Sequence, residues 1–197
     1  DHSAVQLKFS PGESRLIVHD GTGNQYALPR PRMDHSQSLL LDAWTLEIPD
    51  KGSINIVNPL PSWNELGCGD YSGFMRYNTE FTWDQETSHA ILALGDVRYA
   101  ATIYLDGKDM GSCIFTPFML RLSGLRRGKH ILEIRVLNTL ANSVCGTEER
   151  YMQLEKRGVF IGTYAPLYLK LDRQKVISGL LGPVELIPAY IRKDHSK

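Results

Sequence analysis

Hydrophobic and polar residues alternate along much of the chain. The alternation is clearest at residues 77–81, 101–105, 132–136 and 184–186. Because successive side chains of a β-strand point to opposite faces, this period of two places one face against a core and leaves the other in water. Each run therefore predicts a half-buried strand, and stretches with helical periodicity are few.

Turn-forming residues separate these runs, at residues 49–52, 94–96, 106–107 and 127–129. The Asp-Gly pair at 106–107 is the strongest of these signals, because a two-residue type I′ hairpin turn needs positive φ at both central positions. Several short strands at this spacing predict an all-β fold, an antiparallel jelly-roll β-sandwich.

Two regions interrupt this rhythm, and the first is residues 1–40. They hold a strand candidate at 15–18, followed by a stretch rich in Gly, Pro, Arg and Ser. We expect an N-terminal extension here, either the last strand of a preceding domain with a linker or an extra edge strand. The sandwich itself is predicted over residues 41–190, with a short C-terminal tail at 191–197.

The second interruption is the connection over residues 138–183, between two well-marked strands. Within it, residues 148–157 predict a short helix with Tyr151 and Leu154 facing inward. Connections of this length inside a compact domain are usually functional or packed insertions. We therefore expect functional residues to gather near it.

Composition narrows the classes of partner. Lys plus Arg and Asp plus Glu number 22 each, so the formal net charge is zero, and the basic residues form only short clusters. Because nucleic-acid binding needs a basic stripe, we expect no nucleic-acid partner. No apolar run approaches the roughly 20 residues that span a bilayer, so no membrane span is predicted.

The cysteines and histidines do not predict a metal site. Cys68, Cys113 and Cys145 are widely spaced and odd in number, which fits neither a disulfide framework nor zinc ligation. One bridge stays open as an alternative, but three buried thiols are the simpler expectation. The histidines do not fall at metal-ligand spacing. We predict no metal and no other cofactor.

Sequence motifs of catalysis are absent as well. There is no phosphate-binding loop, no dinucleotide fingerprint and no His-Glu-x-x-His, and Ser72 does not lie in a Gly-x-Ser-x-Gly elbow. Glycoside hydrolysis requires two carboxylates roughly 5–9.5 Å apart across a sugar, and the sequence establishes no such pair. We therefore assign no catalytic residue.

Three segments, taken in order, resemble one known family. They are Trp63 to Phe81 with its Asp-Tyr-Ser-Gly-Phe run, Leu92 to Phe118 with its Asp-Gly hairpin, and Leu125 to Val184 with its Gly-Leu-Leu-Gly-Pro-Val close. This order resembles the galactose-binding-like, sugar-binding domain of glycoside hydrolase family 2. It is more similar still to the corresponding C-terminal domain of family 106 α-L-rhamnosidases and related bacterial enzymes.

The resemblance covers residues 41–188 and implies a function. It implies a non-catalytic accessory or carbohydrate-binding domain of a larger glycoside hydrolase, packing on the catalytic domain of the same polypeptide or shaping its active-site rim. It also implies a secreted or periplasmic location. Phe74 stands where the family usually has a small residue, which weakens any transfer of ligand specificity.

Candidate carbohydrate-binding residues follow from residue type and place. Sugars stack on aromatic rings and bond planar polar groups, so Trp63, Tyr71 and Arg76 around one loop are candidates, with Asn138 and Asn142 in the long connection. The resemblance implies that the loop with the two asparagines faces the active site. Each residue also has a structural alternative: a core or domain-contact tryptophan, an arginine paired with a cross-strand acid, and asparagines that cap turns.

Three functional hypotheses therefore stand side by side. An accessory domain predicts an apolar patch exposed in the isolated chain. An autonomous carbohydrate-binding module predicts an exposed aromatic platform and measurable sugar affinity. A self-sufficient small glycosidase, which the sequence favours least, predicts turnover by acids of the 138–183 connection.

Overall fold

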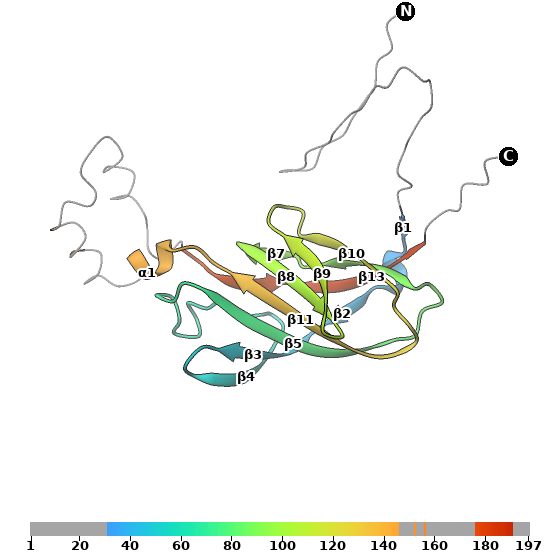
Figure 1. Ribbon diagram of the computed structural model, residues 1–197, viewed down its shortest axis with the longest axis horizontal. Helices are drawn as coiled ribbons and strands as arrows, with labels where there is room; N and C mark the ends of the chain where they lie inside the picture. Colours follow the sequence, from blue (N-terminus) through green and yellow to red (C-terminus); the bar gives the residue numbers. More distant parts are fainter. Residues whose placement is uncertain (1–30, 146–151, 153–155, 157–175, 191–197) are drawn as a thin grey trace, which may run out of the picture.

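The computed structural model describes residues 31–145, 152, 156 and 176–190. Almost every element in this part of the chain is a strand, which confirms the predicted all-β class (Figure 1). The elements are β1 (Arg32–Met33), η1 (His35–Gln37), β2 (Leu39–Leu41), β3 (Ala43–Ile48), β4 (Gly52–Val57), β5 (Phe74–Trp83), β6 (His89–Ala93), β7 (Asp96–Arg98), β8 (Ala100–Leu105), β9 (Lys108–Cys113), β10 (Met119–Ser123), β11 (Gly128–Leu137), α1 (Ala141–Cys145), β12 (Gly179–Gly182) and β13 (Val184–Tyr190).

The strands form two antiparallel layers. One is a six-stranded sheet in the order β4-β3-β5-β11-β8-β9, and the other contains β1-β13-β6-β10 with β2 also paired to β13. Figure 1 shows β5 and β11 at the centre of the first sheet and β13 behind them in the second. The strands β12 and β7 form a small additional pair. The predicted antiparallel β-sandwich is therefore confirmed.

The core lies between the two layers and follows the predicted alternation. In β5 the side chains of Met75, Tyr77, Phe81 and Trp83 are buried, while the residues between them face outward or are only partly covered. Trp44 and Trp63 are also buried, so the core alternative holds for these tryptophans. Burying a large apolar side chain contributes about 1.5–3 kcal/mol, so these rings are main contributors to stability.

The predicted Asp-Gly turn at residues 106–107 is confirmed in detail. Asp106 and Gly107 join β8 to β9 with φ of 51° and 78°, the positive values that a type I′ turn requires. In β12, just before β13, Leu180 is fully buried. Gly95 packs directly on the backbone of Gly182 there, which leaves no room for a side chain.

The segment before residue 41 joins the second sheet where it is described. Arg32 and Met33 pair with the C-terminal end of β13, and residues 39–41 pair with its start. The strand candidate at 15–18 and the C-terminal tail at 191–197 lie outside the described residues, as does all of the predicted 148–157 helix except positions 152 and 156.

The remaining predictions concern thiols, metals and membranes. Cys68 and Cys113 are buried free thiols, and the side chain of Cys145 lies outside the described part. Within the described residues, no group of His, Cys, Asp and Glu is placed to hold a metal ion. None of the helices described is long and apolar enough to cross a membrane.

Candidate interaction surface at one end of the sandwich

The five predicted site residues gather near one end of the sandwich, where β5 begins and β11 ends. Phe74, the first residue of β5, lies directly opposite Leu137, the last residue of β11. The next residue, Asn138, donates its backbone N–H to the carbonyl oxygen of Gly73 at 3.1 Å. The 68–73 loop and the start of the long connection are thus side by side.

Trp63 lies inside this end of the molecule, fully shielded from solvent. Its Nε1 donates to the hydroxyl oxygen of Tyr77 at 2.7 Å, and that oxygen also accepts the backbone N–H of Leu180 at 3.2 Å. Burial raises the pKa of Tyr77 and keeps its hydroxyl neutral. Trp63 therefore ties three segments together from within, and its ring offers no surface to a ligand.

Asn138 is almost completely buried and uses its amide on the neighbouring loop. Its Nδ2 donates to the carbonyl of Tyr71 at 2.7 Å and to Ser178 Oγ at 3.1 Å. Its Oδ1 accepts the N–H of Gly73 at 2.9 Å. In this arrangement both amide hydrogens are used inside the chain, so Asn138 positions the 71–73 loop.

Asn142, in α1, makes a similar set of hydrogen bonds to residues 69, 176 and 178. Its Nδ2 donates to the carbonyls of Gly69 and Val176, at 3.1 and 3.2 Å. Its Oδ1 accepts the hydroxyl of Ser178 at 3.1 Å. The two asparagines thus form hydrogen bonds with backbone groups of the loops, as the turn-capping alternative predicts. Direct contact of either amide with a sugar stays a prediction.

Tyr71 and Arg76, in contrast, lie at the surface. The Tyr71 hydroxyl donates to the carbonyl of Phe74 at 3.0 Å, and its ring packs 5.8 Å from that of Trp63. Arg76 Nη1 lies 3.2 Å from Glu47 Oε2 on β3, so the cross-strand acid of the structural alternative is present. The guanidinium of Arg76 also lies 5.6 Å from the centroid of the Phe74 ring.

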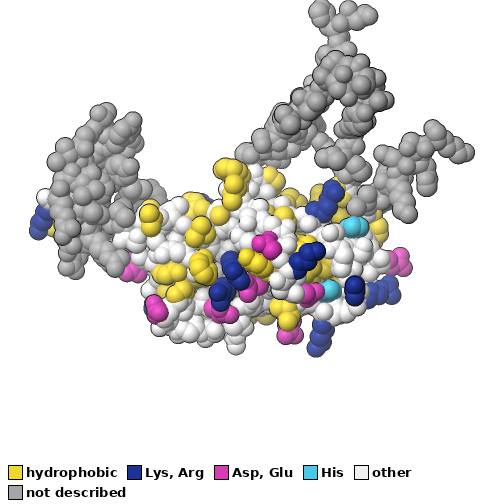
Figure 2. All heavy atoms as spheres, in the orientation of Figure 1, with side chains coloured by type: hydrophobic (Ala, Val, Ile, Leu, Met, Phe, Trp, Pro, Cys, Tyr) yellow, Lys and Arg dark blue, Asp and Glu magenta, His cyan; other side chains and the backbone are white. Residues whose placement is uncertain are grey.

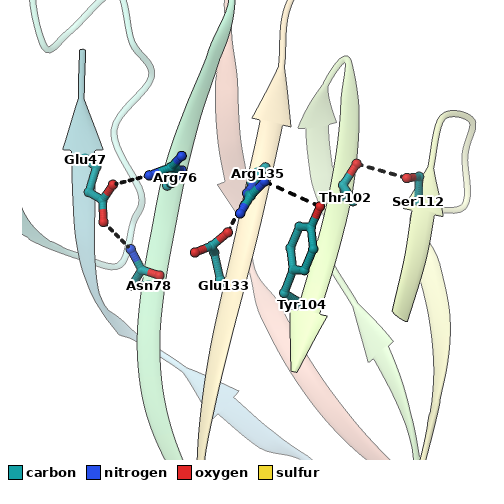
Figure 3. A network of polar contacts seen from close by, with 8 residues as sticks. All are labelled: Glu47, Arg76, Asn78, Thr102, Tyr104, Ser112, Glu133 and Arg135. Carbon is teal, nitrogen blue, oxygen red and sulfur yellow. Dashed lines mark hydrogen bonds and ion pairs between the residues drawn. The ribbon is translucent and has the colours of Figure 1, made fainter. Parts of the chain in front are cut away.

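Arg76 belongs to a polar row that crosses the outer face of the six-stranded sheet (Figure 3). Glu47, Arg76, Arg135, Thr102 and Ser112 are successive register partners on β3, β5, β11, β8 and β9. The two arginines therefore face each other directly, an arrangement of like charges that costs energy unless each is neutralised. Figure 3 shows how each is neutralised, by one carboxylate apiece.

The second arginine, Arg135, is held by Glu133 and Tyr104 in the adjacent row of the sheet. Arg135 Nε bonds Glu133, which raises the pKa of the guanidinium further, and its charge lies 4.2 Å from the ring centroid of Tyr104. On the other side, Asn78 Nδ2 donates to Glu47 Oε1 at 3.1 Å. These contacts fix the side chains in place and give a preorganised polar surface.

An apolar row borders the polar one at the end of the sheet. Phe74, Leu137 and Ala100 are register partners, and Ile114 follows directly after β9 beside them. Phe74, Leu137 and Ile114 are 45%, 49% and 59% exposed. Tyr99, whose N–H bonds the Leu137 carbonyl, adds a further exposed ring. The apolar patch expected of an accessory domain is present.

Figure 2 shows the mixed character of this side of the molecule, where hydrophobic side chains lie among charged ones. Exposed apolar groups with Arg and Tyr at their edge are typical of protein–protein interfaces. The "end patch", defined as Tyr99, Ala100, Ile114 and Leu137, is therefore a candidate contact for another domain, and Phe74 lies at its edge.

An open cleft of about 390 Å³ lies beside the end patch, between the β3–β4 hairpin and the start of β5. Its lining residues are Glu47, Ile48, Pro49, Asp50, Gly52, Ser53, Phe74 and Arg76. A second cleft of about 290 Å³ shares Ile48, Pro49 and Asp50 with it and reaches Tyr71. A larger groove of about 640 Å³ is lined by residues of β2–β5 and by none of the five predicted site residues.

Sequence reasoning missed two of the residues that shape this cleft. Phe74 has the same strand parity as Arg76, so the alternation already placed it on the outer face. The resemblance predicts a small residue at this position, so the large Phe74 was a signal in the sequence that could have marked it as a candidate. Glu47 carried no comparable signal, because its position opposite Arg76 depends on the pairing of β3 with β5.

No protein-family model matches the chain. Among solved structures, a rhamnosidase from Novosphingobium sp. PP1Y aligns with a TM-score of 0.56 and 24% identity, over 83% of this chain and 16% of its own. A GH2 β-galacturonidase from Eisenbergiella tayi aligns with a TM-score of 0.52 and 20% identity, over 86% of this chain and 26% of its own. The fold is a β-sandwich that both of these enzymes also contain.

A curated relative from Formosa agariphila, named "Putative beta-glucuronidase", is 28% identical over 228 residues. The alignment covers 94% of this chain but only 19% of the relative. In all three comparisons this chain therefore corresponds to one small portion of a much longer protein. The predicted resemblance to glycoside hydrolase sandwich domains is confirmed.

Proposed function

We propose that this chain is a non-catalytic accessory domain of a larger glycoside hydrolase. It packs on the catalytic domain of the same polypeptide through the end patch and contributes to the rim of the active site. The observation that carries the proposal is the match of nearly the whole chain to 19% of a longer relative named as a glucuronidase. A parent enzyme of this kind is secreted or periplasmic, by the family resemblance.

The end patch supports this proposal physically. A row of exposed apolar side chains is costly to leave in water, at about 25 cal/mol for each Å² of apolar surface. A partner domain that covers the end patch removes this cost. The acidic residues of the 138–183 connection, which the glycosidase hypothesis would use, lie outside the described residues.

Two measurements test the accessory role. The isolated chain should not hydrolyse aryl α-L-rhamnosides, β-D-galactosides or β-D-glucuronides. In the parent polypeptide, Leu137→Asp and Ile114→Asp should loosen the domain and speed its release by limited proteolysis, while Ile131→Asp, equally exposed on the same sheet but outside the end patch, should not. Turnover by the isolated chain, or equal proteolysis of all three variants, would overturn the proposal.

An autonomous carbohydrate-binding module is the second candidate. The cleft beside Phe74 and Arg76 favours it, because it combines an exposed aromatic ring with an oriented pair of polar groups. Calorimetric titration of the isolated chain with rhamnose, galactose and glucuronate separates this function from a purely structural one.

A further inference from the structure

The cleft between the β3–β4 hairpin and β5 has the size of a small-ligand site. Its volume of about 390 Å³ lies within the range of roughly 300–1,000 Å³ that is usual for such pockets. It opens on the outer face of the sheet and adjoins the second cleft through Ile48, Pro49 and Asp50. A ligand larger than one sugar ring therefore has room to extend past Tyr71.

The cleft offers an apolar surface carried by an anchored segment of backbone. The Phe74 ring is 45% exposed, and the guanidinium of Arg76 lies 5.6 Å from its centroid. The backbone carbonyl of Phe74 accepts the Tyr71 hydroxyl, and Asn138 holds the preceding loop. A partly exposed aromatic ring is a platform for the C–H face of a sugar, which stacks on it through dispersion and the ring quadrupole.

Beside this ring stand a hydrogen-bond donor and acceptor that are already oriented. Glu47 accepts from Arg76 through one oxygen and from Asn78 through the other, so its carboxylate cannot rotate freely. Ser53, opposite Glu47 on β4, adds a hydroxyl. A sugar hydroxyl both donates and accepts, so a neighbouring pair of hydroxyls matches an Arg–Glu pair, and charge-assisted bonds of this kind are the stronger ones.

The charges of the cleft select among sugars. Glu47 and Asp50 supply two carboxylates against the single guanidinium of Arg76, so the lining of this cleft carries an excess of negative charge. A uronate carboxylate would meet repulsion here, whereas the hydroxyls of an uncharged sugar would not. We infer that this cleft is a binding subsite for an uncharged glycosyl residue, stacked on Phe74 and bonded to the Arg76–Glu47 pair. The inference rests on the proposed function for the class of ligand.

An NMR titration of the isotope-labelled chain tests this inference. The probes are methyl α-L-rhamnoside and methyl β-D-galactoside as uncharged sugars and sodium glucuronate as the charged one. We expect saturable shifts of the backbone amides of residues 47–48, 50–53 and 74–76 with an uncharged glycoside, at concentrations of about millimolar to tens of millimolar. Glucuronate should bind at least about tenfold more weakly, a difference of about 1.4 kcal/mol.

Matched variants locate the site and test its charge. Phe74→Ala should weaken binding at least about tenfold, whereas Ile131→Ala, which removes an exposed apolar side chain elsewhere on the same face, should leave it unchanged. Asp50→Asn should improve glucuronate binding, because asparagine tolerates the φ of 61° at this position and removes one repulsive charge.

The outcomes separate this inference from the proposed function. No saturable shift with either uncharged glycoside, shifts that map away from the cleft, or preferred binding of glucuronate by the unchanged chain would each overturn the subsite. None of these results bears on turnover or on proteolysis of the parent polypeptide, which decide the accessory role. Thermal unfolding of each variant shows whether lost binding comes with an intact fold.

Discussion

The imidazole of His130 on β11 and the carboxylate of Asp106 in the β8–β9 turn form a close pair. Nδ1 of His130 lies 2.7 Å from Oδ2 of Asp106, and Nε2 lies 2.8 Å from the carbonyl oxygen of Arg126. Both ring nitrogens thus face acceptors, and only the protonated imidazolium can donate to both. The ring is buried and stacks on Phe81, 5.4 Å away between centroids.

This pair makes stability depend on pH. Burial acts to lower the pKa of His130, but the bonds to Arg126 and Asp106 outweigh it and raise the pKa. The folded state therefore binds the proton more tightly than the unfolded state, so the contribution is complete below the unfolded pKa of about 6.5 and is lost as pH rises through the folded value. We expect Tm to fall by a few degrees between about pH 6 and pH 8.

Asp106 makes the stability depend on pH in the acid range as well. Burial acts to raise its pKa, but the N–H of Ile131 and the His130 ring outweigh it, so the pKa is lowered and the contribution disappears as pH falls below about 4. Asp106→Asn keeps the turn geometry and should flatten both limbs of the Tm profile, whereas Asp84→Asn, an exposed control, should not. An unchanged profile in Asp106→Asn would rule out this source of pH dependence.

The buried amide of Asn138 should be costly to remove. Asn138→Ala leaves the N–H of Gly73, the carbonyl of Tyr71 and the hydroxyl of Ser178 without this partner. Buried polar groups left unpaired cost about 1–3 kcal/mol each before relaxation, so we expect a loss of about 3 kcal/mol in denaturant unfolding. The exposed Asn55→Ala should change stability by less than about 0.5 kcal/mol. Equal effects would mean that water replaces the amide at Asn138.

The hydroxyl of Tyr77 serves two buried donors, Trp63 Nε1 and the N–H of Leu180. Tyr77→Phe keeps the ring but removes the shared acceptor, so the free energy of unfolding should fall by about 2–4 kcal/mol. Tyr104→Phe is the matched control, because its hydroxyl is on the outer face and meets Arg135 only at 3.5 Å. It should cost less than about 0.5 kcal/mol in the same urea titration.

Gly95 should not tolerate a side chain, because it packs against the backbone of Gly182. A Cβ at this position would collide with the backbone of Gly182 and the carbonyl of Pro183, and φ is 65°. Gly95→Ala should therefore destabilise the fold far more than the roughly 1 kcal/mol expected from positive φ alone. Gly124→Ala, with φ of 79° and open space around it, measures that conformational cost by itself. Similar Tm values for the two variants would refute the role of the contact.

Local patterns were enough to predict most of the fold. The period of two over residues 132–136 correctly placed Leu132, Ile134 and Val136 in the core, because a strand has only two faces. The Asp106–Gly107 turn was equally local, since its backbone requirement restricts the residue types. The pairing of residues 32–33 and 39–41 with β13 could not be predicted locally, because nothing in their own sequence specifies a partner so far along the chain.

The candidate site was harder to predict for the same reason. Trp63 and Arg76 have residue types that suit a sugar, yet one is in the core and the other on the surface, and only tertiary packing separates the two cases. Asn138 and Asn142 were singled out as polar residues in a long connection. Their bonds go to residues 34 to 73 positions away, which no local pattern can specify.

The bonds of Asn142 have a consequence for the two ends of the long connection. Asn142 precedes the undescribed part of the long connection, whereas Val176 and Ser178 follow it, and the amide joins all three. The point where the chain leaves the sandwich, at Asn142, and the point where it returns, at Val176 and Ser178, are therefore held together by hydrogen bonds. Because loop-closure entropy grows only slowly with length, these hydrogen bonds can hold the two ends of the connection together almost independently of the number of residues between them.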